Sequence, residues 1–160
     1  MKIKIYTTGG TIDKIYFDAK SEFQVGEPQI SGLLKEANIT FDYQVESLMR
    51  KDSLEMTDAD RALIAERLRD ETTDRILLTH GTDTMVDTAR QLVGIEGKTI
   101  VLTGSMQPAR LRVSDAIFNI GFAVAAVQLL PPGVYVAMNG ELFDPLHARK
   151  NVAAHRFEKV

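Results

Sequence analysis

Two threonine-rich segments carry the side chains of this sequence that could do chemistry. Residues 8–12 (TGGTI) and residues 79–85 (THGTDTM) each follow a short run of apolar, β-prone residues. Paired glycines after a strand release the backbone into a tight turn, which leaves Thr11 exposed above the edge of a sheet. A threonine in that place is a candidate nucleophile. Taken alone, the same segment also fits an ordinary strand-to-helix turn in which Thr11 caps a helix.

A threonine hydroxyl needs a base, a group that sets that base, and donors for the oxyanion that forms on attack. Thr82 and Asp83 lie on one sharp turn, and Lys150 follows the last predicted strand through a connection rich in turn formers. A buried lysine beside a carboxylate and a hydroxyl can lose its proton and pass basicity to the threonine. The alternative is a solvated Lys150, because most lysines are surface charges.

The sequence gives less support to catalysis by cysteine, by a metal site or by serine. The chain has no cysteine, which excludes disulfides, thiolate catalysis and cysteine metal sites. His80, His147 and His155 lack the spacing of a zinc site, and a lone histidine that ends a strand is usually structural. Ser105 is a weaker nucleophile candidate than the threonines, because a strand-end turn that supplies N–H groups explains it better. We therefore expect neither a metal nor a cofactor.

The composition of the chain limits the kinds of binding partner and the location that we expect. The chain has 160 residues, 44% of them hydrophobic and 26% charged, which suits one domain over residues 1–160. The net charge of −3 comes from scattered charges without a basic stripe, so we expect no nucleic acid. The longest apolar stretch, residues 117–130, is too short to span a bilayer. Because residues 1–6 run directly into the first predicted strand without the features of a signal peptide, we expect a cytoplasmic protein.

Alternating strands and helices predict the fold. Three helices are expected, after Thr57, near Thr84, and from Ser114 to just before Pro131. The five β-prone runs cover residues 3–8, 41–48, 75–79, 99–103 and 134–138. This order predicts a three-layer α/β/α fold with a mostly parallel sheet, of the flavodoxin or Rossmann type.

Ligands of such sheets bind at the carboxyl ends of the strands. The residues that follow strand ends here are Thr11, Thr82, Asp83, Ser105 and Met106. Residues 14–26 fit none of the predicted elements, and we expect them to form a mobile flap over the site.

Taken together, these motifs resemble those of the N-terminal catalytic domain of the bacterial-type L-asparaginases, a family of threonine amidohydrolases. The resemblance extends through residues 138–139 to Lys150 and covers nearly the whole chain. The matching segments are residues 8–12, residues 80–85 (HGTDTM), residues 104–108 (GSMQP), and Asp115 with residues 118–119. The resemblance implies the fold of that domain, with the family's C-terminal domain absent.

The resemblance also implies a reaction. Thr11 would attack the side-chain amide of asparagine, ammonia would leave, and water would release aspartate. Thr82, Asp83 and Lys150 would lie on the opposite side of the substrate. Ser53 would hold the substrate's α-carboxylate, and Asp83 would face its α-amino group. The backbone around Thr82 and the turn of Ser105 and Met106 would help to bind the amide oxygen. Gly10 and Gly81 complete the implied substrate site.

Three departures from the family pattern qualify that reading. Phe23 stands where a tyrosine normally offers a hydroxyl to the nucleophile, so Tyr16 is expected to replace it unless the flap aligns differently. Leu54 replaces a polar residue near the substrate's amino end. The sequence also stops soon after Lys150. We therefore expect weaker substrate binding, and a homo-oligomer, a dimer or larger, that covers the apolar surface a second domain would hide.

Two other classes of function stay open. Residues 7–11 (TTGGT) also resemble a flavodoxin-type phosphate loop, which would suit a flavin or phosphate module, although the chain has no Trp and no evident aromatic pair. A non-catalytic paralogue that binds an amino acid is the other class. An amidotransferase component would need an RNA surface, which nothing basic supports. Within the hydrolase reading, glutamine is a second substrate, since one methylene gives only about 1–3 kcal/mol of discrimination.

Overall fold

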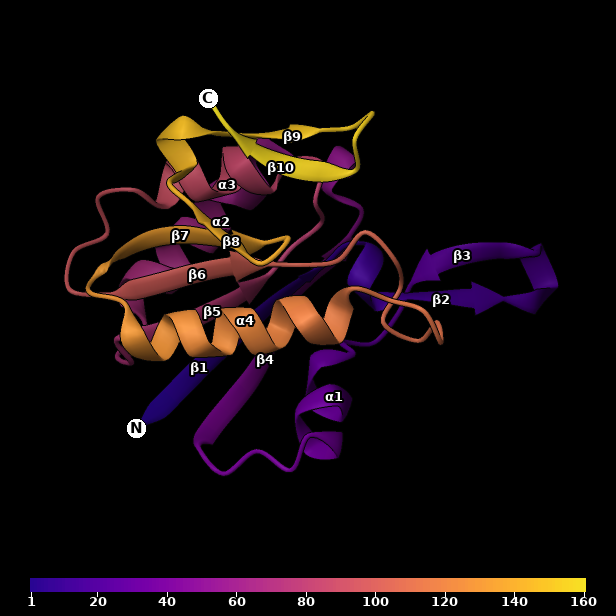
Figure 1. Cartoon of the computed structure of the whole chain (residues 1–160), viewed down its shortest axis with the longest axis horizontal. Coiled ribbons are helices and arrows are strands. Elements are labelled where there is room, and N and C mark those ends of the chain that lie inside the picture. Colours follow the sequence, from indigo (N-terminus) through magenta and orange to yellow (C-terminus); the bar gives the residue numbers. More distant parts are fainter.

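A six-stranded sheet forms the centre of the computed structural model, which describes all 160 residues except the side chain of Ala19. The strand order is β4-β1-β5-β6-β7-β8 (Figure 1). The first five strands in this order, from β4 to β7, run parallel to one another. Strand β8 at the edge is antiparallel to β7. The bounds are β1 Lys2–Gly9, β4 Asp42–Lys51, β5 Arg75–Thr79, β6 Thr99–Thr103, β7 Gly133–Met138 and β8 Glu141–Phe143. The predicted mostly parallel sheet and its five strands are confirmed.

Helices cover both faces of this sheet, as the prediction of three layers requires. Helices α2 (Asp58–Asp70) and α3 (Met85–Leu92) pack on one face, and α1 (Ile30–Glu36) and α4 (Ala116–Leu129) pack on the other. Successive side chains of a strand point to opposite faces. Accordingly Ile76 and Leu78 of β5 join the core beside α2 and α3, and Leu77 joins the core beside α4.

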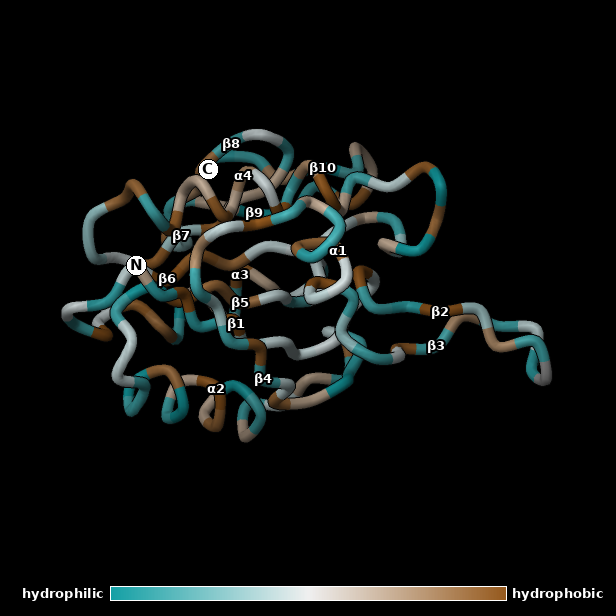
Figure 2. Tube along the Cα trace, turned by 90° about the horizontal axis from the view of Figure 1, so that it is seen from below, coloured by the Kyte–Doolittle hydropathy of each residue, from teal (hydrophilic) through white to brown (hydrophobic). Residues whose placement is uncertain are grey.

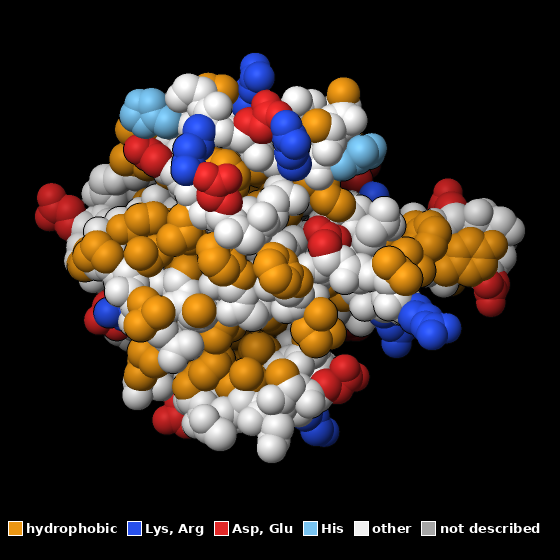
Figure 3. Space-filling view, viewed as in Figure 1, with side chains coloured by type: hydrophobic (Ala, Val, Ile, Leu, Met, Phe, Trp, Pro, Cys, Tyr) orange, Lys and Arg blue, Asp and Glu red, His pale blue; other side chains and the backbone are white. Residues whose placement is uncertain are grey.

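The predicted helix ends are confirmed at two positions. The Thr57 hydroxyl accepts the N–H of Asp60 (3.1 Å), and the Asp60 carboxylate accepts the N–H of Thr57 (2.8 Å), which makes a capping box at the start of α2. Helix α4 begins after Asp115 and ends before Pro131. The sequence of α4 contains no charged residue, and Ile117 and Phe118 are exposed on its outer side. Figure 3 shows an apolar band along that side.

Two antiparallel hairpins were not predicted. Strands β2 (Lys14–Phe17) and β3 (Glu22–Val25) form a hairpin that projects beyond the body of the molecule (Figures 1 and 2). Strands β9 (Ala148–Asn151) and β10 (Arg156–Lys159) form the other, which packs against α3 through Ala148 and Phe157. Short 3₁₀ turns lie at Thr11–Asp13 (η1), Asp18–Lys20 (η2), Ser53–Glu55 (η3) and Pro145–His147 (η4). Among the described residues, no helix combines the length and the apolar character needed to cross a bilayer.

Candidate active site

A cavity of about 550 Å³ opens at the carboxyl ends of the central parallel strands. It is lined by four of the residues that the sequence analysis named as catalytic candidates: Thr11, Thr82, Asp83 and Lys150. The remaining lining residues are Met106, Gln107, Val113, Ser114, Asp115, Asn139 and His155. The strand-end location predicted for the chemistry is where this cavity lies.

The turn that carries Thr11 depends on Gly10. Strand β1 ends at Gly9, and the 3₁₀ turn η1 begins at Thr11. Gly10 has a φ of 84°, which side chains disfavour. A Cβ on Gly10 would lie 2.5 Å from the Cα of Gly81, so the two signature segments touch backbone to backbone. Gly10 therefore sets the distance between the turn of Thr11 and the turn of Thr82.

Ser53 lies beneath this contact and does not line the cavity. A Cβ on Gly81 would lie 2.6 Å from the Cβ of Ser53, and Ser53 is 2% exposed. The Ser53 hydroxyl accepts the N–H of Thr84 (3.4 Å), and its carbonyl accepts the Thr84 hydroxyl (2.8 Å). In this structure Ser53 supports the turn at residues 82–84, and its expected contact with a substrate carboxylate stays a prediction. The adjacent Leu54 points into solvent.

Lys150 is held between two acceptors. Its Nζ donates to Thr82 Oγ1 (2.7 Å) and to Asp83 Oδ1 (2.7 Å). The Lys150 side chain is only 13% exposed, so the alternative of a solvated surface lysine is wrong. Strand β9 carries Lys150 to this point after the β7–β8 turn and η4. The predicted cluster of lysine, carboxylate and hydroxyl is present.

Asp115 organises the opposite wall. Its carboxylate accepts the backbone N–H groups of Met106 (2.9 Å) and Gln107 (3.0 Å), and it also accepts Asn119 Nδ2 (3.0 Å). The N–H of Met106, expected near the substrate's amide oxygen, is therefore already hydrogen-bonded. Ser105 is buried and its hydroxyl donates to the carbonyl of Gln107. Both residues shape the wall, and the donor role expected for Met106 is not seen.

The β2–β3 hairpin stands away from the cavity. Tyr16, expected to serve Thr11, is 52% exposed and packs edge to face on Phe23, with ring centroids 5.6 Å apart. No described side chain of this hairpin lines the cavity. Residues 14–26 thus form a hairpin that points outward (Figure 1), and their expected role as a mobile flap over the site stays a prediction.

His80 is a structural residue, as its place at the end of a strand predicts. It is fully buried, and burial lowers its pKa to about 4. Its Nδ1 lies 2.7 Å from the carbonyl of Gly81, and its Nε2 lies 2.7 Å from the Thr88 hydroxyl. The neutral ring with its proton on Nδ1 satisfies both contacts, because the carbonyl can only accept. His80 thereby fixes the peptide next to Thr82.

The lining residues to which the sequence analysis gave no role in the site include Val113, Asn139 and His155. Asn139 and His155 both have positive φ angles, 56° and 50°. The Asn139 side chain accepts the N–H of Phe157 (2.9 Å) and so ties the β7–β8 turn to β10. The Asn139-Gly140 pair is a standard hairpin turn signal that would have marked this place. Nothing in the sequence marks His155.

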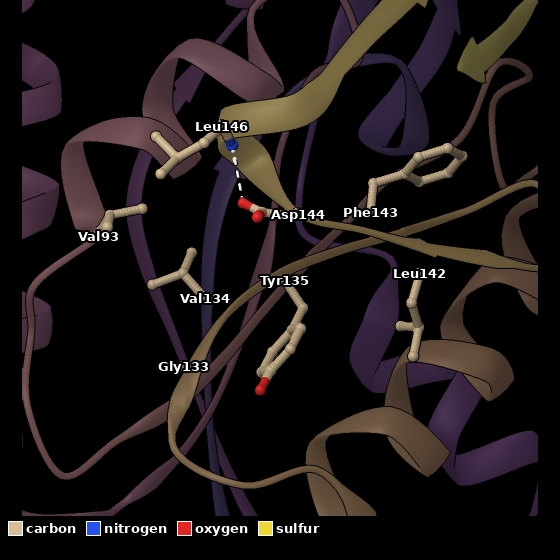
Figure 4. Close-up of a pocket in the computed structure, with 8 residues that line it drawn as sticks. All are labelled: Val93, Gly133, Val134, Tyr135, Leu142, Phe143, Asp144 and Leu146. Atoms are coloured by element: carbon tan, nitrogen blue, oxygen red, sulfur yellow. Dashed lines mark hydrogen bonds between the residues drawn. The ribbon is translucent and has the colours of Figure 1, made fainter. Parts of the chain in front are cut away.

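A second cavity, of about 480 Å³, lies beside the first half of β7 and has an apolar lining (Figure 4). Asp144 is the carboxylate in it, and that group accepts the N–H of Leu146 (2.9 Å). Among the residues that the structure describes, no group of three or more metal-ligating side chains occurs. The candidate chemistry therefore stays at the carboxyl ends of the strands.

The fold and the site define a class: a doubly wound α/β protein whose small-molecule site holds two threonines, a lysine and a carboxylate at the carboxyl edge of the sheet. The family model described as asparaginase, N-terminal, matches residues 2–158. The chain therefore belongs to the asparaginase family, as the sequence motifs indicated.

Known proteins agree with this assignment. The glutaminase-asparaginase of Pseudomonas aeruginosa is 30% identical, over 94% of this chain and 45% of its own length. A probable periplasmic L-asparaginase of Haemophilus influenzae is 32% identical, over 88% of this chain and 43% of its own. The crystal structure of a probable cytoplasmic L-asparaginase from Campylobacter jejuni is similar, with a TM-score of 0.80, 28% identity, and coverage of 99% and 52%. The chain spans about half the length of the relatives it matches.

Proposed function

We propose that this chain is an amidohydrolase that converts L-asparagine to L-aspartate and ammonia through an acyl-enzyme on Thr11. The observation that carries the proposal is the hydrogen-bonded cluster of Lys150, Thr82 and Asp83 in the cavity that Thr11 lines. A hydroxyl nucleophile needs a neighbouring group that can accept its proton, and a lysine held by a hydroxyl and a carboxylate is a candidate for that group. Family membership and the names of the relatives support the same reaction.

In the proposed first step, Thr11 Oγ1 attacks the side-chain amide carbon of asparagine. The hydroxyl proton of Thr11 passes to the leaving nitrogen, the C–N bond breaks, and ammonia departs. An ester joins Thr11 to the acyl group. Water then attacks this ester, which releases aspartate and restores the Thr11 hydroxyl. Both steps develop negative charge on the carbonyl oxygen, so donors directed at that oxygen lower both barriers.

Thr82 and Asp83 have distinct parts in this proposal. Thr82 accepts a hydrogen bond from Lys150, so its own O–H proton is available to the cavity and can orient the attacking water. Asp83 uses Oδ1 for Lys150, which leaves Oδ2 for the substrate's α-ammonium group. Because Asp115 holds the N–H of Met106, we assign the oxyanion to the backbone N–H groups around Thr82.

The direct test is ammonia release from L-asparagine by the purified chain. Thr11→Val keeps the shape of the side chain and removes the hydroxyl, so it should abolish release. His147→Gln, on the exposed turn η4, is the control and should release ammonia at the wild-type rate. Absence of release from folded wild-type protein would contradict the proposal. L-Glutamine assayed alongside gives the substrate ratio, which the name glutaminase-asparaginase of a relative makes relevant.

A non-catalytic amino-acid-binding protein is the second candidate. It is favoured by the exposed Tyr16 and by Phe23, since neither supplies a hydroxyl to the cavity. This candidate predicts that asparagine raises the Tm of the wild-type chain without ammonia release. A phosphate or flavin module predicts a yellow sample, or a Tm raised by inorganic phosphate or by flavin mononucleotide.

We further propose that residues 1–160 act as one domain and that two copies pair through the outer side of α4. That side exposes Ile117 and Phe118 on a helix without charged residues. Sedimentation of the wild type against Phe118→Glu tests it, and a wild-type monomer would contradict it. The location in the cytoplasm stays a prediction, because the relatives include a protein named periplasmic and one named cytoplasmic.

A further inference from the structure

Asp13 is a buried carboxylic acid in the same 3₁₀ turn as Thr11. It is 2% exposed, and the proposed reaction gives it no role. Its carboxylate accepts the backbone N–H of Gln29 (2.9 Å), at the start of α1. The burial of this acid with a single described hydrogen bond requires an explanation, because a buried charge without a partner lowers the stability of the fold.

The turn that carries Thr11 is tied to the rest of the chain at four points. The N–H of Gly10 donates to the carbonyl of Lys51 (2.9 Å). The carbonyl of Asp13 accepts the N–H of Gly26 (2.8 Å), directly after the β2–β3 hairpin. The carboxylate of Asp13 accepts Gln29, and the carbonyl of Ile12 accepts the N–H of Ala109 (3.1 Å), from the loop that forms the cavity wall. Asp13 thus makes two of the four hydrogen bonds that anchor the turn of Thr11.

The charged groups around Asp13 do not neutralise it. Arg50 of β4 is the charged side chain that acts on the Asp13 carboxyl. The charged residues next in the chain to Asp13 or to the partners of its turn are Lys14, Glu27, Lys51 and Arg110. Lys14 pairs with Asp52, Lys51 with Asp60, and Arg50 with Glu27. No ion pair of Asp13 occurs among the side chains that the structure describes. Burial raises the pKa of Asp13 to about 7, against the opposing effects of the Gln29 N–H and of Arg50.

We propose that Asp13 is a positioning residue that holds the Thr11 turn in its present geometry while its carboxyl group is neutral, and releases that geometry when the group ionises. The inference rests on the proposed function for its effect on turnover. Ionisation strengthens the bond from the Gln29 N–H but leaves a buried charge without a counter-ion, and this charge attracts further donors or water into its site. Arg50 is the cation that acts on Asp13, and its present ion pair with Glu27 is exposed and therefore weak. Either response displaces Gly26 and Gln29, and with them Thr11.

The decisive variant is Asp13→Asn, which keeps an oxygen for the Gln29 N–H and cannot ionise. We would measure kcat/KM for asparagine from pH 5.5 to 9. Wild-type kcat/KM should fall above about pH 7, approaching tenfold per pH unit, and Asp13→Asn should lack that fall. Asp18→Asn, on the exposed end of the same hairpin, is the control and should keep the wild-type profile. The same alkaline fall in Asp13→Asn would overturn the proposal.

A second measurement needs no activity. Amide hydrogen exchange of Gly26 and Gln29 reports directly on the two ties that Asp13 makes. Their protection should drop through about pH 7 in the wild type and stay level in Asp13→Asn. If neither protein releases ammonia, the proposed function fails, and the exchange data still decide the role of Asp13. Equal protection in both proteins across this range would refute it.

Discussion

The backbones of Gly10 and Gly81 touch: a Cβ placed on Gly10 would lie 2.5 Å from the Cα of Gly81. These residues are far apart in the sequence and end neighbouring parallel strands, β1 and β5. A side chain on Gly10 would push the two turns apart, and a side chain on Gly81 would collide with Ser53. The geometry of the site is therefore set by the absence of two Cβ atoms.

Gly81→Ala should damage both stability and activity. Its Cβ would meet Ser53 Cβ at 2.6 Å and Ser53 Oγ at 2.7 Å, contacts that force the turn at residues 82–84 to shift. We expect a loss of about 1–3 kcal/mol in the free energy of unfolding and loss of most activity. Urea unfolding and ammonia release are the measurements. Gly32→Ala is the control, because nothing lies within 4 Å and α1 should become slightly more stable.

Lys150→Met should remove activity and leave the fold intact. The change leaves the Thr82 hydroxyl and the Asp83 carboxylate without their shared donor. If Lys150 assists proton transfer, kcat should fall about 10²–10⁴-fold. Lys159→Met, on the neighbouring strand β10, removes an exposed lysine paired with Glu141 and should have little effect. A Lys150→Met enzyme with wild-type kcat would remove Lys150 from the mechanism.

Asp115→Asn should disturb the cavity wall. Asp115 accepts from Met106, Gln107 and Asn119, and an asparagine would place a donor against one of these donors. We expect destabilisation of about 1–3 kcal/mol and a higher KM. Asp144→Asn, at the distant apolar cavity of Figure 4, is the matched change at a site without proposed chemistry. Equal KM values for the two variants would show that the wall does not shape the substrate site.

His80 should make the fold sensitive to acid. Its pKa in the folded chain is lowered from 6.5 to about 4 by burial, so the unfolded chain binds the proton more readily. Its contribution is fully present above pH 6.5 and is lost as the pH falls towards 4, by about 3 kcal/mol at most. Urea unfolding of the wild type and His80→Gln between pH 4.5 and 7.5 checks this. Asp13 titrates with the opposite sign, so the difference between the two proteins isolates His80.

The sequence predicted the parts of the fold that follow from local pattern. Runs of apolar residues marked the central strands, and Thr57 with Asp60 marked the start of α2. The same reasoning brought Thr11 and Thr82 to one edge of the sheet. It did not predict the β2–β3 hairpin, because Tyr16 and Phe23 pack mainly on each other and show no periodicity that points to a core.

The parts of the site that sequence reasoning did not predict depend on tertiary contacts. The burial of Ser53 follows from the close approach of Gly81, which no motif encodes. The N–H of Met106 is already hydrogen-bonded because the Asp115 carboxylate accepts it. Lys150 was correctly placed beside Asp83, but through the resemblance to a family as much as through its spacing. His155 reaches the cavity only because the β9–β10 hairpin folds back over α3.

The contact between Lys150 and the Thr82–Asp83 turn also has a consequence for folding kinetics. Lys150 lies 68 residues from Thr82 and 67 from Asp83 in the sequence, and between them the chain must complete α3, β6, α4, β7 and β8. Contacts between distant residues form late, because a long loop must close first. After dilution from urea, catalytic turnover should therefore recover more slowly than the far-ultraviolet circular dichroism signal. The recovery of turnover would then report the rate at which Lys150 reaches the Thr82–Asp83 turn.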